Sequence, residues 1–189
     1  MVKGLRSALY VVFVPLLLSF RLFGEDFGLH HFQPYIALFF ALAALRKWSW
    51  LALSAVGYLV STIVSTHLAG GVIQLWILAP LLAFVLITFW GKCFSQRSGT
   101  PSLLAGSLGG AGIFYLVTNF VSWLTIPQYA KSLSGLMQAL WTGIPGYPPT
   151  WSFFRNDAVA AVLFTAMILV INQLTFTKKE ATAPSLSPS

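Results

Sequence analysis

The side chains that could do chemistry lie mostly in one stretch, residues 114–157. Asn119 and Trp123 are four positions apart, so on a helix they share a face that presents an amide and an indole. Such a face either lines a ligand site or hydrogen-bonds to a neighbouring helix. Arg155 and Asp157 raise a similar choice, because they either face a cavity or, in the case of Asp157, cap the last helix.

A second group of ionisable residues comes early in the chain. Glu25, Asp26, His30 and His31 are residue types that bind divalent cations. Adjacent histidines point in different directions, however, and rarely ligate one ion together. We therefore expect a solvated loop with a weak pH response, and we predict no metal site and no cofactor.

Signatures of the common enzyme classes are absent from the sequence. It contains no Gly-x-Ser-x-Gly nucleophile motif, no His-Glu-x-x-His zinc helix and no Gly-Lys-Ser/Thr phosphate loop. Asp157 has no second carboxylate near it in the sequence for paired acid–base work. We expect a protein that is not an enzyme.

The composition is that of an integral membrane protein. The chain is 57% hydrophobic and 8% charged, with a mean hydropathy of +0.80 over 189 residues. The net charge is +7, but the cations separate apolar runs instead of clustering, so we expect the lipid bilayer as partner and no nucleic acid. The single cysteine, Cys93, excludes an intrachain disulfide.

Six apolar runs approach the length of about 20 residues that crosses a membrane. They predict an all-α polytopic membrane helix bundle within a single membrane domain, residues 1–177, followed by a disordered cytoplasmic tail, residues 178–189. The predicted spans are about residues 7–23, 29–45, 49–66, 72–91, 102–126 and 157–176.

The distribution of cations predicts the orientation. With a cytoplasmic N-terminus, eight lysines and arginines fall on the inner side and three on the outer side, which follows the positive-inside rule. We therefore predict a multi-pass protein of the bacterial inner (plasma) membrane with both termini in the cytoplasm. The outer cations are Arg21, Lys131 and Arg155.

A short amphipathic pattern at residues 132–144 predicts an interfacial helix on the outer side. Its apolar positions recur at helical spacing, but thirteen residues are too few to span. The helix is either a lid over an outward-facing cavity or a helix that rests in the head groups. Its apolar face consists of Leu133, Leu136, Met137, Leu140, Trp141 and Ile144.

Small residues form stripes on two predicted spans. Gly106 and Gly110 have the Gly-x-x-x-Gly spacing that allows another helix to approach closely, and Ala37 and Ala41 repeat it with alanine. These faces serve either packing inside the bundle or docking of other membrane subunits.

Residues 114–164 resemble the terminal half of a bacterial family of small membrane proteins known only as a domain of unknown function. Most of residues 21–174 take part, including Arg21 and Phe32–Ala37. The chain departs from that family where an Asp is expected, since Ser61 and Thr62 stand there. The matching positions are Thr118-Asn119-Phe120, Trp123, Tyr129, Gly135-Leu136, Ile144-Pro145 and Asp157.

That family is similar in size and six-helix layout to the substrate-binding S components of energy-coupling-factor transporters. The resemblance implies a membrane subunit that binds a small molecule, which the sequence does not identify. The alternative is a non-catalytic structural or assembly subunit of a larger membrane complex. The expected ligand-binding residues are Asn119, Trp123, Trp141, Arg155 and Asp157.

Overall fold

The computed structural model describes residues 31–68, 70–71, 78–95 and 97–180, with side chains up to residue 173. Within these ranges all regular secondary structure is helical, which confirms the predicted all-α class. The predicted first span (7–23), Glu25, Asp26 and His30, and residues 181–189 of the predicted tail lie outside them. The helices are α2 (Tyr35–Ala44), α3 (Trp48–Leu68), α4 (Leu78–Lys92), α5 (Thr100–Thr125), α6 (Leu133–Leu140) and α7 (Thr150–Glu180).

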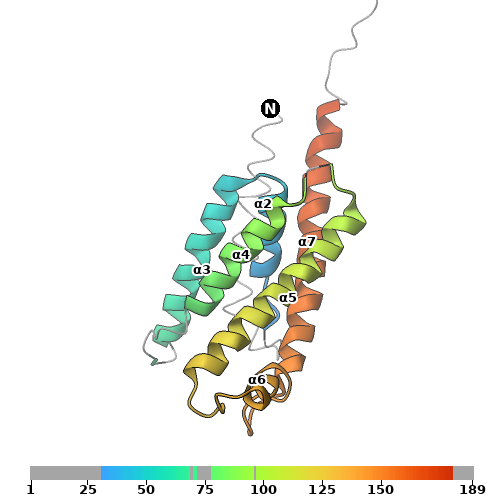
Figure 1. Ribbon diagram of the computed structural model, residues 1–189. Coiled ribbons are helices and arrows are strands. Elements are labelled where there is room, and N and C mark those ends of the chain that lie inside the picture. Colours follow the sequence, from blue (N-terminus) through green and yellow to red (C-terminus); the bar gives the residue numbers. More distant parts are fainter. Residues whose placement is uncertain (1–30, 69, 72–77, 96, 181–189) are drawn as a thin grey trace, which may run out of the picture.

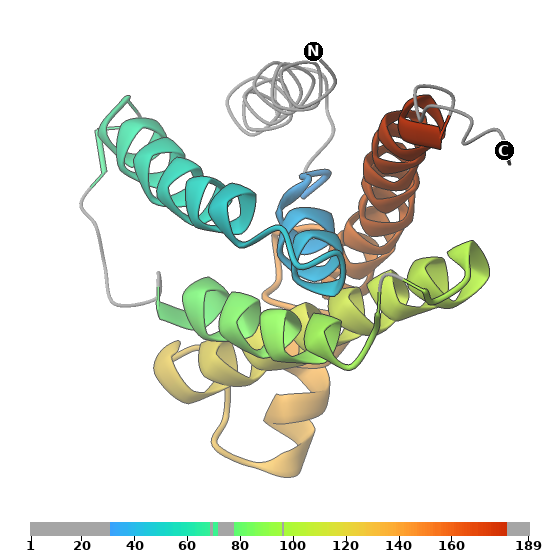
Figure 2. The same cartoon turned by 90° about the horizontal axis from the view of Figure 1, so that it is seen from above.

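The long helices form a bundle around α2. In Figure 1 the α2–α3 and α4–α5 connections lie at one end, and α6 lies at the other, between the end of α5 and the start of α7. Seen along the bundle, α2 lies in the middle (Figure 2), and it contacts α3, α4, α5 and α7. All ten residues of α2 are buried, because its sequence YIALFFALAA is apolar on every side.

Small residues let neighbouring helices approach α2 closely. A Cβ on Gly91 of α4 would lie 2.6 Å from the carbonyl oxygen of Phe40, and one on Gly106 of α5 would lie 2.5 Å from the ring of Phe40. Gly110 faces Ile36 and Ile87, and Ala37 and Ala41 are buried. Both small-residue stripes therefore pack inside this chain.

Three helices in the described part of the chain are long and apolar enough to cross a membrane, not the six predicted for the whole sequence. They are Trp48–Leu68, Thr100–Thr125 and Thr150–Gln173. α2 and α4 have 10 and 15 residues, or about 15 and 22 Å at 1.5 Å per residue, which is less than the hydrocarbon thickness of about 30 Å. Their predicted spans, 29–45 and 72–91, are therefore longer than these helices.

Helix α3 turns large apolar side chains outward and polar ones inward. On α3 the buried residues are Ser54, Tyr58, Ser61 and Thr62, whereas Val56 and other large apolar residues of this helix are exposed. The same outward apolar surface continues on α4, α5 and α7, for example at Phe89, Leu116 and Val159. A water-soluble bundle would show the opposite distribution, so these helices suit a lipid environment.

Candidate functional site at the α6 end

Asp157 is a carboxylate inside the bundle. Its side chain is only 4% exposed, and Oδ1 accepts no hydrogen bond within the described structure. The predicted helix cap at Asp157 is wrong, since α7 begins at Thr150 and not at residue 157, which places Asp157 two turns inside the helix. Thr150 directly follows two prolines that end the preceding turn.

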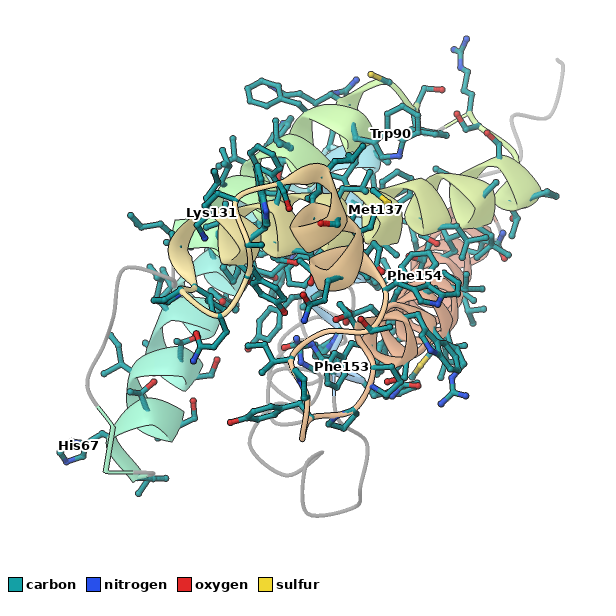
Figure 3. The ribbon with its side chains drawn as sticks, turned by 60° about the horizontal axis from the view of Figure 1, so that its bottom comes forward. His67, Trp90, Lys131, Met137, Phe153 and Phe154 are labelled. Carbon is teal, nitrogen blue, oxygen red and sulfur yellow. The ribbon has the colours of Figure 1, made fainter. Side chains whose placement is uncertain are left out.

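His31 is the ionisable residue that faces Asp157. Its Nδ1 lies 3.9 Å from Asp157 Oδ2, and its ring centroid lies 4.4 Å from that of Phe153, one helical turn before Asp157. Phe32 packs against Phe164 farther along the same helix. The segment before α2 thus runs along one face of α7, and His31, with 46% of its side chain exposed, lies between Asp157 and the outside. Figure 3 views the molecule from this end and labels Phe153 near the centre of the view.

A second buried polar contact joins α2 to α3. Tyr35 Oη lies 2.8 Å from Ser61 Oγ, which also donates a hydrogen bond to the Tyr58 carbonyl. The next residue, Thr62, is 1% exposed, and its Oγ1 has no partner within the described structure. Neutral hydroxyls therefore occupy the place where the resembling family is expected to carry an acid.

Helix α6 exists, but it covers residues 133–140 and not 132–144. Ser132 caps its N-terminus by accepting a hydrogen bond from the Gly135 amide at 3.3 Å, and Gly143, with φ +74°, ends the turn after it. A Cβ on Gly135 would lie 1.9 Å from the Ala130 carbonyl oxygen, so only glycine allows this contact.

Part of the apolar face of α6 points away from the bundle, whereas Leu136, Leu140 and Ile144 are half-buried. Gly135 and Ala139 are its buried residues, while Leu133, Met137 and Trp141 are 73, 51 and 65% exposed. A lid that closed with its apolar face inward would bury these large side chains and expose the small ones. In the described structure α6 instead rests on α5 and α7 through its small residues.

The chain between α5 and α6 is held by polar contacts. The Lys131 ammonium donates hydrogen bonds to the carbonyls of Trp123 and Ile126 at the C-terminal end of α5, where a cation is favourable. The Trp123 indole donates to the Ala130 carbonyl at 2.8 Å. Trp123 is therefore engaged with its own connecting segment.

The five predicted ligand-binding residues do not form one site in the described structure. Asn119 donates to the carbonyl of Tyr115 in its own helix, Trp141 is exposed, and Arg155 is exposed with its guanidinium 5.6 Å from the Trp151 ring. No hydrogen bond, ion pair or ring contact joins two of the five side chains in the part of the chain that is described. Asp157 alone is buried.

Sequence reasoning missed the partners of the buried polar groups. His31 was considered as a metal ligand, yet the described residues contain no group of three or more His, Cys, Asp or Glu that could hold a metal. Tyr35 and Ser61 appeared only as parts of a resemblance. One sequence signal indicates such contacts: a hydroxyl or imidazole within a long apolar run. Burying such a group without a hydrogen-bond partner costs free energy, so a partner is expected.

The comparisons with known proteins agree with the resemblance to an uncharacterised family. Searches of curated proteins and of solved structures found no match. A family model described as a family of unknown function, DUF6580, matches residues 3–184, which is most of the chain. The chain therefore belongs to the DUF6580 family.

Proposed function

We propose that this chain is an integral membrane subunit that binds a small solute at the α6 end of its bundle, with Asp157 as the recognition group. The observation that carries the proposal is the buried carboxylate with an unpartnered oxygen. A charge in a membrane interior is costly, and such residues commonly mark ligand or ion pathways. A solute with a hydrogen-bond donor or a positive charge would complement Asp157.

The form of α2 supports this proposal. It begins at Tyr35, a residue that is 0% exposed, and the segment before it reaches Asp157 through His31. Short helices that start inside a bundle are typical of transporter binding sites, because they leave backbone groups free for ligands. His31 would connect the acid to the aqueous side.

The proposed topology retains six crossings. α2 and α4 would cross together with the apolar residues that flank them in the sequence, and the first run would cross before residue 30. The end with Arg46 and Lys92 would face the cytoplasm of a bacterial inner membrane. α6 would then rest at the outer interface, with Leu133, Met137 and Trp141 among the lipids.

One resemblance bears on the wider role of the chain. The size and the expected six-helix layout are similar to those of energy-coupling-factor S components, which supports transport as the process. The structural or assembly subunit has less support. Such a subunit would dock other chains through the small-residue stripes. In this structure Gly106 and Gly110 face side chains of the same chain, and Ala37 and Ala41 are buried.

The test is a search for a bound small molecule. The full chain is purified from membranes, denatured, and the released molecules are identified by mass spectrometry beside those from Asp157→Asn, which keeps the shape of the side chain and removes its charge. We expect a small molecule that is enriched with the wild type and lost from the variant. An empty wild-type protein, or equal recovery from both, would contradict the proposal.

A further inference from the structure

Two basic residues lie at the end of the bundle opposite α6. The Arg46 guanidinium donates a hydrogen bond to the Lys92 carbonyl at 3.1 Å, and both residues are exposed. Arg46 lies in the α2–α3 connection and Lys92 ends α4, at the end of the molecule drawn at the top of Figure 1. One hydrogen bond leaves most of the five guanidinium donors available.

The backbone at Arg46 favours a different residue. Arg46 has φ +57°, and its amide and that of Lys47 donate to Ala43 and Leu42, which closes α2 in a Schellman motif. Glycine is preferred at this left-handed position because any other side chain is strained there. A strained backbone conformation at Arg46, where glycine would be unstrained, suggests that the arginine side chain has a function.

Helix packing brings the backbone of Lys92 beside Arg46. Gly91, directly before Lys92, lets α4 approach the α2 backbone, since a Cβ there would lie 2.6 Å from the Phe40 carbonyl oxygen. The Lys92 ammonium lies 5.4 Å from the Trp48 ring centroid and 4.9 Å from that of Phe89. Those rings are 44 and 58% exposed, so the cations lie beside aromatic side chains that suit the boundary between head groups and acyl chains.

No carboxylate neutralises this pair among the side chains that are described. Asp157 is the only acidic one of them, and it lies on the first turns of α7, near α6. Two neighbouring cations without an acid favour an anion from outside the chain.

We propose that Arg46 and Lys92 form a binding site for the phosphate of an anionic phospholipid, such as phosphatidylglycerol. The guanidinium and ammonium contact the phosphate, and the exposed rings of Trp48 and Phe89 contact the glycerol and upper acyl region. A membrane lipid fits better than a soluble anion because α3 and α4 expose large apolar residues beside the cations.

The test compares lipids bound to the purified full chain. The protein in uncharged detergent is mixed with equal amounts of phosphatidylglycerol and phosphatidylcholine, and the retained lipid is measured by native mass spectrometry. We expect a preference for phosphatidylglycerol that falls about tenfold in Arg46→Gly combined with Lys92→Gln. Arg155→Gln, which removes an exposed cation near α6, should keep the preference.

The single variant Arg46→Gly separates binding from folding. Glycine relieves the left-handed conformation, so the melting temperature without lipid should stay the same or rise while the lipid preference falls. A preference that survives in both Arg46→Gly and Lys92→Gln would overturn the proposal. Equal thermal protection by inorganic phosphate and by phosphatidylglycerol would assign the site to a soluble anion instead.

Discussion

Tyr35 Oη and Ser61 Oγ lie 2.8 Å apart in the buried contact between α2 and α3. Tyr35→Phe removes this hydrogen bond and keeps the ring, which packs edge-on against Tyr58. We expect a loss of about 1 kcal/mol in the free energy of unfolding, measured by denaturation in mixed detergent. Ser65→Ala, which removes a hydroxyl bonded only within α3, is the matched control and should cost less. If the two variants lose the same free energy of unfolding, the hydrogen bond between α2 and α3 contributes no more than one within α3.

Replacing Gly135 with alanine should destabilise the protein, whereas the same replacement at Gly112 should not. Gly135→Ala places a Cβ against the Ala130 carbonyl, so the start of α6 must move, and we expect a loss of about 2 kcal/mol or more. Gly112→Ala in α5 meets nothing within 4 Å and should be neutral or stabilising by up to about 1 kcal/mol. Thermal unfolding of both variants checks this, and a neutral Gly135→Ala would contradict the described packing of α6.

The outward apolar face of α6 predicts contact with lipid. Cys93 is the single cysteine, so Cys93→Ser provides a background for spin labels. In lipid vesicles a label at Met137→Cys should be relaxed more by oxygen than by a water-soluble nickel complex. Stronger relaxation by the nickel complex would place this side of α6 in water.

Lys131 predicts a charge-dependent contribution at the end of α5. Replacing it with Gln removes the cation from the carbonyls of Trp123 and Ile126, and we expect a loss of roughly 0.5–1 kcal/mol. Lys131→Arg keeps the charge and should recover part of this stability. The measurement is the unfolding free energy at low and high salt, where the difference between Gln and wild type should shrink as salt rises. A difference that does not respond to salt would show that the charge is unimportant.

The apolar runs predicted most of the long helices. The predicted spans 49–66 and 102–126 agree with α3 and α5 to within two residues at each end, because charged or proline-containing segments bound these runs. The start of α7 was missed because Asn156 and Asp157 resemble a helix cap, and that local signal competes with the start after Pro149. Hydropathy also extended α2 through Pro34, although the regular helix begins only at Tyr35.

The candidate site was predicted only in part. Asp157 was identified from its residue type, but its neighbour His31 lies 126 positions away. Their contact depends on how the segment before α2 packs along α7, which local patterns do not encode. The direction of α6 was also beyond the sequence, because helical spacing defines an apolar face without saying whether bundle or lipid covers it. Gly135 lies on the buried side of α6, where its contact with the Ala130 backbone leaves no room for a Cβ.

The position of α2 has a consequence for how the chain is made. All ten of its residues are covered by protein, and all four helices it contacts, α3, α4, α5 and α7, come later in the sequence. The central helix of the bundle is therefore synthesised before the helices that pack around it. The ten helical residues of α2 are fewer than the number that crosses a bilayer, so we expect the final packing of α2 to be completed only after synthesis of α7. Chains that stop before Thr150 should accordingly be recognised and degraded by membrane quality control.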